Sequence, residues 1–239
     1  MRHRSLAVAG ASLTMLALPP AVQAAPTLLE PLKPCYASAG TPESPQVEGV
    51  MLRATGFTPN AKVELTLDGK PVPGGDRLQT YTDGTLGAFT PVQVPAPFVA
   101  RGTRKFTLEL TEVDNPENAL TATARATALN VSVRPRSARP SSRVRYRGSG
   151  FTAPQPVYAH YVHYSRNPYR VGGQTGQLVR TVRMERPSGD CGTFRVRRRQ
   201  IPVRDPRVGF WLIQFDQSRR YAVPPTTAFH QLLIHVHQR

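Results

Sequence analysis

A ten-residue segment occurs twice in this chain, and this repeat limits the folds that the chain can adopt more than any other feature. Residues 50–59 read Val-Met-Leu-Arg-Ala-Thr-Gly-Phe-Thr-Pro, and residues 144–153 read Val-Arg-Tyr-Arg-Gly-Ser-Gly-Phe-Thr-Ala. The shared Gly-Phe-Thr begins at Gly56 in the first copy and at Gly150 in the second, an offset of 94 residues. Similarity at a fixed offset is typical of a duplicated structural unit.

Further segments match in the same order along the chain. The matched pairs are residues 63–67 with 157–161, Gly87-Ala-Phe89 with Gly192-Thr-Phe194, Val94-Pro95 with Ile201-Pro202, and residues 106–110 with 211–215. Several matches in one order favour duplication over a single large domain. The repeat predicts two domains, residues 25–131 and residues 132–239.

The composition favours β-strands within each repeat. The chain contains 24 Pro and 18 Gly, which leave little room for helices. Apolar residues recur at every second position in residues 106–110, 211–215 and 232–236, which is the period of a half-buried strand. Pro and Gly clusters separate these runs at the spacing typical of β-sandwiches. We therefore expect an all-β chain with almost no helix.

The repeated segments resemble a known family. Arg53-Ala-Thr-Gly-Phe-Thr-Pro59 and Arg147-Gly-Ser-Gly-Phe-Thr152, each followed by an alternating strand, are similar to the immunoglobulin-like repeats of bacterial secreted and surface proteins, including those of the IPT/TIG type. The resemblance implies two tandem immunoglobulin-like β-sandwich domains and an extracellular spacer or binding role. It implies no catalytic residues. The copies differ at Ala54 and Gly148, and the second has a longer insert across Ser165–Pro187.

The N-terminus predicts export from the cytoplasm. Arg2, His3 and Arg4 precede an uncharged apolar run over residues 6–18, which is too short to span a bilayer as a helix. Small residues at Val22-Gln23-Ala24 suit a signal peptidase, so we expect a signal peptide over residues 1–24, cleaved after Ala24 or Ala25. The alternative is an internal core helix. No Cys follows the apolar run, so we expect a secreted chain without a lipid anchor or a transmembrane segment.

The chain contains two cysteines, Cys35 in the first predicted domain and Cys191 in the second. An even number of cysteines in a secreted chain favours a disulfide, which here would cross the domain boundary and restrict the relative orientation of the domains. Free buried thiols and an intermolecular bridge remain alternatives. The separation of the two Cα atoms decides among them, because a disulfide needs less than about 7 Å.

Charge is divided unequally between the predicted domains. The first holds nine Lys or Arg and eleven Asp or Glu, for a net charge of −2; the second holds twenty Arg, no Lys and four acids, for a net charge of +16. Arginine alternates with core-type residues in two segments, and alternation places the guanidinium groups on one solvent face of a strand. These arginines are Arg143, Arg145, Arg147, Arg195, Arg197 and Arg199.

Such clusters favour an anionic partner bound through planar, bidentate contacts. The candidate partners are cell-wall polymer, acidic polysaccharide, phospholipid headgroups and extracellular nucleic acid. Nucleic acid is the least favoured, because the chain contains no recognised nucleic-acid-binding motif. The alternative is that arginine merely solvates the surface of a structural spacer protein.

Aromatic and histidine side chains suggest two further sites. Alignment with the first repeat predicts that Tyr158, His160 and Tyr164 point outward, where the tyrosines could stack on sugars or pack under the insert. His235 and His237 share one face of the last strand, a spacing compatible with two metal ligands, but no third ligand lies near them in the sequence. We expect no metal and no cofactor.

The sequence favours a non-enzymatic protein. It contains no His-Glu-x-x-His, Gly-x-Ser-x-Gly or Walker motif. The remaining catalytic alternative is a carbohydrate-active hydrolase, which needs two carboxylates flanking its bond. Asp205 and Asp216 are the candidate pair, and only a pocket that holds two convergent carboxylates or a Ser/His pair would support this class.

Overall fold

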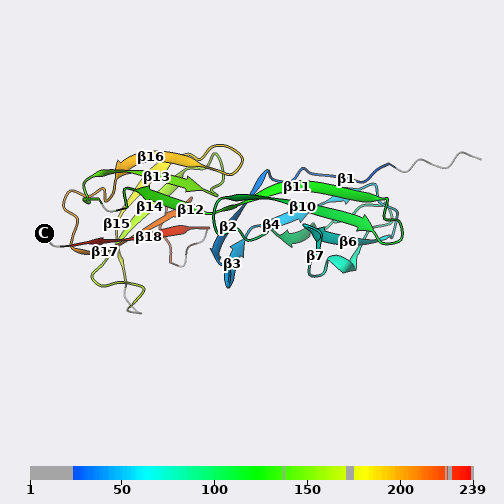
Figure 1. The fold of residues 1–239 in the computed structure, drawn as a ribbon, viewed down its shortest axis with the longest axis horizontal. Helices are drawn as coiled ribbons and strands as arrows, with labels where there is room; N and C mark the ends of the chain where they lie inside the picture. Colours follow the sequence, from blue (N-terminus) through cyan, green and yellow to red (C-terminus); the bar gives the residue numbers. More distant parts are fainter. Residues whose placement is uncertain (1–23, 137, 171–174, 224, 226–227, 238–239) are drawn as a thin grey trace, which may run out of the picture.

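The structure, a computed structural model, describes residues 24–239 except 137, 171–174, 224, 226–227 and 238–239, and this part of the chain is all-β (Figure 1). It contains eighteen strands, one short 3₁₀ turn (η1, Gly75–Arg77) and no α-helix. The predicted signal peptide, residues 1–24, lies outside the described residues except at Ala24. Within the described ranges, no helix is long and apolar enough to cross a membrane.

Buried apolar side chains form two separate cores that lie end to end along the long axis of the molecule (Figure 1). Phe106 and Leu65 belong to the first core, and Trp211 belongs to the second. The chain passes from one core to the other between Ala128 and Leu129, three residues before the predicted boundary. We call residues 24–128 the first half and residues 129–237 the second half.

Two layers of strands enclose the first core. One layer is a sheet of order β3-β2-β11-β10-β6-β7, in which β8 also pairs with β6, and the other consists of the pairs β1-β5 and β4-β9. The strands are β1 (Thr27–Leu28), β2 (Cys35–Thr41), β3 (Ser44–Val47), β4 (Gly49–Leu52), β5 (Ala54–Thr55), β6 (Lys62–Leu67), β7 (Lys70–Pro71), β8 (Leu78–Gln79), β9 (Val92–Pro95), β10 (Thr103–Glu112) and β11 (Ala119–Ala128).

Two layers likewise enclose the second core. One sheet has the order β12-β13-β16, and the other has the order β15-β14-β17-β18. The strands are β12 (Asn130–Arg134), β13 (Arg143–Ser149), β14 (Val157–Tyr164), β15 (Gln177–Glu185), β16 (Phe194–Arg199), β17 (Gly209–Asp216) and β18 (His230–Val236). β15 falls within the segment that the sequence comparison treats as an insert, and it is an edge strand paired with β14.

Strand pairing repeats between the halves. Leu65 on β6 lies opposite Leu110 on β10, as Ala159 on β14 lies opposite Phe215 on β17. Gly56 and Gly150 both have positive φ, at 89° and 82°. Each lies beneath the chain that enters its half, so that a Cβ on either glycine would contact backbone within 3.0 Å. These two glycines therefore occupy equivalent positions, as the repeat predicts.

The match of residues 106–110 with 211–215 agrees with this register, but two other matches are wrong, those of Gly87–Phe89 with Gly192–Phe194 and of Val94-Pro95 with Ile201-Pro202. The Phe57 amide donates to the carbonyl of Gly84, and the Phe151 amide donates to that of Gly192, both at 3.3 Å. Gly84 is thus the counterpart of Gly192, and Gly87 is not. The first half has extra loop residues between this glycine and β9, whereas in the second half the chain continues directly into β16.

The same shift applies to the residues that follow. Phe89 is 83% exposed, whereas Phe194 is buried. The true counterpart of Phe194 is Leu86, which bridges to Ala54 as Phe194 pairs with Gly148. The Val94-Pro95 match fails in the same way, because Val94 pairs with Val50 while the equivalent Val144 pairs with Arg198 rather than with Ile201.

The difference between Ala54 and Gly148 is explained by packing. A Cβ on Gly148 would lie 2.1 Å from the ring of Phe194, so only glycine fits under this phenylalanine. In the first half the smaller Leu86 takes the place of the phenyl ring, and Ala54 fits beneath it. The residue sizes at the two positions are therefore complementary in each half, and both cores are filled.

A polar side chain closes the Gly-Phe-Thr turn in both halves. The amide of Thr58 donates to the Glu112 carboxylate, and the amide of Thr152 donates to Gln217 Oε1 at 2.8 Å. Glu112 ends β10, and Gln217 directly follows β17, so both side chains reach the turn from equivalent positions. This shared contact is independent evidence for duplication, because the two side chains differ in charge but not in role.

Replacement of Gly192 by alanine tests the contact that aligns β13 with β16. Gly192 has φ +53° and a Cβ there would lie 1.4 Å from the Phe151 carbonyl oxygen. Gly189→Ala is the matched control, since Gly189 has φ +70° but nothing lies within 4 Å of its Cβ position. We expect Gly189→Ala to lower the free energy of unfolding by about 1 kcal/mol and Gly192→Ala by about 3 kcal/mol or more. Equal losses in urea titrations would contradict this account.

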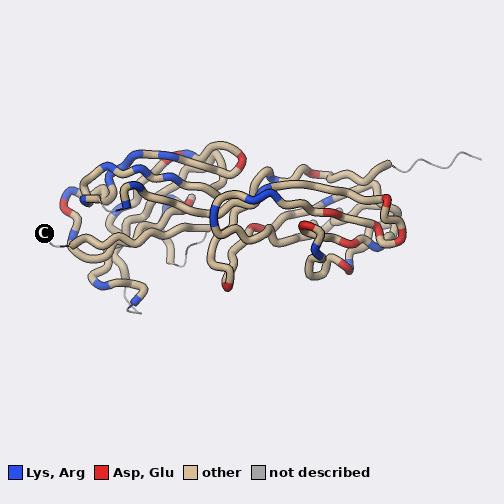
Figure 2. Tube along the Cα trace, in the orientation of Figure 1, with Lys and Arg blue, Asp and Glu red and all other residues tan. Residues whose placement is uncertain are grey.

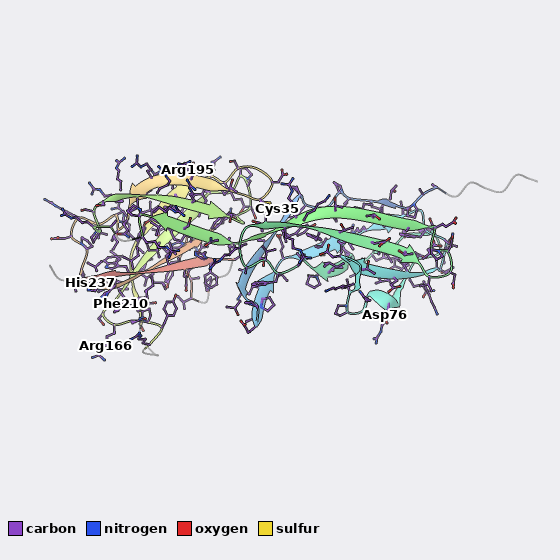
Figure 3. The ribbon with its side chains drawn as sticks, in the orientation of Figure 1. Cys35, Asp76, Arg166, Arg195, Phe210 and His237 are labelled. Carbon is purple, nitrogen blue, oxygen red and sulfur yellow. A yellow bond between two sulfur atoms is a disulfide. The ribbon has the colours of Figure 1, made fainter. Side chains whose placement is uncertain are left out.

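A disulfide joins the two halves. Cys35 opens β2, Cys191 lies in the turn before β16, and their Cα atoms are 5.0 Å apart across a sequence separation of 156 residues. Figure 3 places Cys35 where the two bodies meet. This pairing replaces the alternatives of free thiols and an intermolecular bridge. The amide of Leu129 also donates to the Ser38 carbonyl at 2.6 Å, which fixes the same junction through the backbone.

Peptide mapping without reduction tests the disulfide. We expect Cys35 and Cys191 in one linked peptide, and we expect the Cys35→Ala/Cys191→Ala variant to lose about 2–4 kcal/mol of stability, because a cross-link over a long loop restricts the unfolded chain. Two thiols that react with iodoacetamide in the oxidised, native protein would contradict the pairing.

Candidate anion-binding face

The six arginines predicted from the sequence lie together on the outer face of one sheet. β13 and β16 are antiparallel, and their register places arginine directly opposite arginine at three successive outward positions. We define the arginine face by these three pairs, which are Arg143 with Arg199, Arg145 with Arg197, and Arg147 with Arg195. Figure 2 shows Lys and Arg gathered along these strands, whereas acidic residues are mostly in the first half.

Alternation and register together produce this face. Val144, Tyr146 and Val196 are buried in the second core, so their strand neighbours must point to solvent. Successive outward residues on a strand are about 6.8 Å apart, and neighbouring strands are about 4.8 Å apart. The guanidinium groups therefore extend from a grid of two columns and three rows.

The arginine face is electrostatically unfavourable in the free protein. Arg195, together with burial and then Arg147 and Arg197, holds the pKa of Arg145 below its usual value. Among the described residues, no carboxylate oxygen lies within 4.0 Å of any of the six guanidinium groups. Like charges placed directly opposite one another in a sheet destabilise it. The fold therefore holds these cations together without internal neutralisation.

The equivalent face of the first half is nearly uncharged. The pairs that correspond to Arg143–Arg199 and Arg145–Arg197 are Gly49 with Pro95 and Met51 with Gln93. The counterpart of Arg147 is Arg53, whose Nη1 lies 3.5 Å from Glu30 Oε1. The same architecture thus forms without an arginine grid, so the fold itself does not require one.

A shallow pocket of about 430 Å³ borders the arginine face along β12. Arg134, Arg136 and Arg147 line it, and Arg134 lies opposite Arg145 across the strand pair. Arg134 and Arg136 were not among the arginines predicted from the sequence, because they lie close to the predicted boundary between residues 131 and 132. The alternation of Val131 and Val133, which pack in or against the second core, was the available signal.

The predicted aromatic site does not form one exposed patch. Tyr158 and Tyr164 are both half-buried and lie at opposite ends of β14. Tyr164 packs over Gly176 and beside Tyr221, and burial, followed by the nearby Tyr164, raises the pKa of Tyr221 to about 12. Tyr164 is therefore half-buried because it packs beneath the neighbouring segments, as one of the two sequence-based alternatives proposed.

The expectation that His160 points to solvent is wrong. His160 is 0% exposed, and both ring nitrogens make hydrogen bonds. The chain after β17 folds over this outer sheet face, so that the Ser218 carbonyl contacts the imidazole and the Tyr221 ring lies 5.6 Å from it. An outward position on a strand is exposed only where no other segment covers it.

The candidate hydrolase pair is not assembled. Asp205 is exposed and precedes β17, whereas Asp216 is buried at the far end of the same strand. Asp205 lies in the loop before Gly209, where β17 begins, and Asp216 ends this strand. Asp216 binds His160 instead, at 3.2 Å between Oδ1 and Nε2.

The histidines at and just after the end of β18 contact other rings rather than a metal site. The His235 ring stacks on Phe210 with centroids 4.1 Å apart, and the His237 ring lies 3.9 Å from His235. In the part of the chain that the structure describes, no group of three or more His, Cys, Asp or Glu side chains could hold a metal ion.

A groove of about 720 Å³ lies at the junction of the halves. Among the described residues that line it, Glu48 is the one charged side chain, and Phe151 and Leu129 supply apolar surface. Its chemistry therefore differs from that of the arginine face, and it does not suit an anionic ligand.

No protein-family model matches this chain, and no curated protein matches it.

Neutralising one cation tests the strain on the arginine face. We expect Arg145→Gln to raise the melting temperature in about 20 mM salt, because repulsion from Arg195 and its neighbours is relieved, and the gain should shrink at about 500 mM salt as charges are screened. Arg101→Gln, which removes an exposed arginine of the first half, is the control and should change little. A lower melting temperature for Arg145→Gln at both salt concentrations would show that the grid is not strained.

Proposed function

We propose that this chain is a secreted, non-enzymatic protein of two tandem immunoglobulin-like domains, and that its second domain binds an anionic polymer of the cell envelope or extracellular space through the arginine face. The observation that carries the proposal is the set of three directly opposed arginine pairs without carboxylate partners. Its contrast with the uncharged face of the first half supports a functional origin of the charge.

A polymer suits the shape of this face. Small-molecule sites are usually concave, whereas the outer surface of a sheet is open. A chain with regularly spaced anionic groups can lie across several guanidinium groups, each of which offers bidentate hydrogen bonds. Binding relieves the repulsion within the grid and releases the counterions of the polymer, so affinity should fall steeply with salt.

The predicted signal peptide and the disulfide support the extracellular location. Disulfides persist mainly in oxidising compartments. The second candidate function is a structural spacer, which the cross-junction disulfide favours because it restricts movement between the halves. A spacer does not by itself account for the charge difference between two faces of the same architecture.

Charge reversal in the full-length protein tests the proposal. We expect Arg195→Glu/Arg197→Glu/Arg199→Glu to elute from heparin–agarose at much lower salt than the wild type, because three contacts become repulsive. For the wild type, the logarithm of the binding constant should fall with that of the salt concentration with a slope of magnitude about 5, near the number of guanidinium groups on the face. Lys62→Glu/Lys70→Glu/Arg101→Glu, which makes the same charge change on exposed residues of the first half, is the matched control.

Equal losses of heparin affinity in both triple variants would show that only net charge matters. No retention of the wild type at low salt would leave the spacer function as the better account. Circular dichroism of each variant should retain the β-type spectrum of the wild type, which separates loss of binding from loss of fold.

A further inference from the structure

A second cationic pocket lies on the other sheet of the second half. It has a volume of about 450 Å³, and Tyr158, Thr181, Arg183 and Arg219 line it. Tyr158 on β14 lies directly opposite Arg183 on β15, and Arg219 comes from the chain after β17. The pocket is separate from the arginine face, which belongs to the sheet of β12, β13 and β16.

The charged groups of this pocket have no partners within the protein. Among the described residues, neither Arg183 nor Arg219 donates a side-chain hydrogen bond or forms an ion pair. Thr181 differs, because its hydroxyl lies 2.9 Å from His160 Nδ1. Two free guanidinium groups and one anchored hydroxyl therefore converge on the same space.

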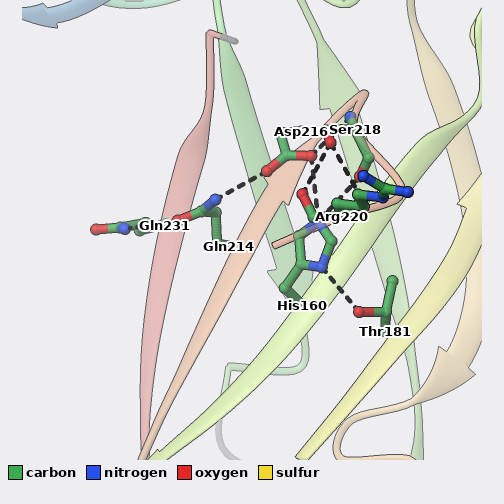
Figure 4. Close-up of polar contacts among 7 residues, drawn as sticks. All are labelled: His160, Thr181, Gln214, Asp216, Ser218, Arg220 and Gln231. Carbon is green, nitrogen blue, oxygen red and sulfur yellow. Dashed lines mark hydrogen bonds and ion pairs between the residues drawn. The ribbon is translucent and has the colours of Figure 1, made fainter. Parts of the chain in front are cut away.

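Behind the pocket, His160 is held in a buried polar network (Figure 4). Its Nε2 lies 3.2 Å from Asp216 Oδ1 and 3.1 Å from the Ser218 carbonyl oxygen. Asp216 accepts further hydrogen bonds from the Ser218 amide and from Gln214 Nε2, each at 2.8 Å. Because Asp216 and Ser218 offer only acceptors to Nε2, this nitrogen carries a proton.

The protonation state of the other nitrogen sets the direction of the Thr181 hydrogen bond. When His160 is neutral, Nδ1 is an acceptor, so the Thr181 hydroxyl donates inward and presents lone pairs to the pocket. When His160 is protonated, Nδ1 donates to Thr181, and the hydroxyl proton is free to point into the pocket. The buried Asp216 carboxylate lies beside the imidazolium in this second state.

We propose that the pocket of Tyr158, Thr181, Arg183 and Arg219 binds a compact oxyanion of the sulfate or phosphate type, and that binding takes up one proton at His160. The oxyanion accepts from both guanidinium groups and from the Thr181 hydroxyl, which donates outward only when Nδ1 is protonated. Asp216 compensates the added charge, and the Tyr221 ring also lies against the imidazole, with 5.6 Å between the ring centroids. This site goes beyond the proposed polymer-binding face and does not depend on it.

Sulfate titrations of the full-length protein by calorimetry test the proposal, because sulfate keeps its charge of −2 between about pH 5 and pH 8. If sulfate binding takes up a proton, thermodynamic linkage requires tighter binding at lower pH. The affinity should then rise by up to tenfold for each pH unit. Calorimetry in buffers of different ionisation enthalpy should show uptake of up to one proton per sulfate. Arg183→Gln/Arg219→Gln should reduce the affinity at least tenfold.

Two variants of Thr181 separate this mechanism from general electrostatics. Thr181→Val should retain weak sulfate binding but lose most of the proton uptake, and Thr181→Ser should restore it, because the hydroxyl is the group that responds to His160. Arg77→Gln/Arg101→Gln, at exposed arginines of the first half, should leave sulfate binding and proton uptake unchanged. Sulfate binding without proton uptake, or affinity unaffected by Arg183→Gln/Arg219→Gln, would overturn the proposal whatever the outcome for the polymer.

Discussion

The contact between the Phe151 backbone and Gly192 is the constraint on which the rest of the second half depends. This backbone hydrogen bond joins the ends of β13 and β16, so it fixes the register of the two strands without any side-chain contact. A slip of one residue would turn every side chain of a strand to the opposite face. Arginines would then enter the core, and Tyr146 would face solvent. The position of Gly192 therefore determines which side chains form the arginine face.

The first half provides a position-by-position comparison for the second. Gly84 and Phe57 make the same contact in the first half, and Glu112 closes the turn there as Gln217 does in the second. The two halves share these backbone constraints while their outer faces differ in charge. The same architecture thus carries two different surface chemistries within one chain, and this difference supports our proposal that the arginines bind a partner.

Alternation in the sequence predicted the all-β class, the strands that carry the core and all six arginines of the grid, because side-chain direction in a strand follows from position alone. It did not predict that Gly84 and Gly192 are equivalent, because extra loop residues before β9 shift the alignment of the two halves. It also missed the burial of His160, which depends on how the chain after β17 folds back over the sheet. Contacts made by loops have no period that a sequence comparison can detect.

Arginine footprinting of the full-length protein tests the central claim most directly. Modification by phenylglyoxal, followed residue by residue by mass spectrometry, measures the accessibility of each guanidinium group with and without a saturating polyanion such as heparin. We expect slower modification at the six arginines of the arginine face and no change at Arg77 and Arg101 of the first half. Protection spread evenly over both halves, or confined to arginines outside β13 and β16, would contradict it.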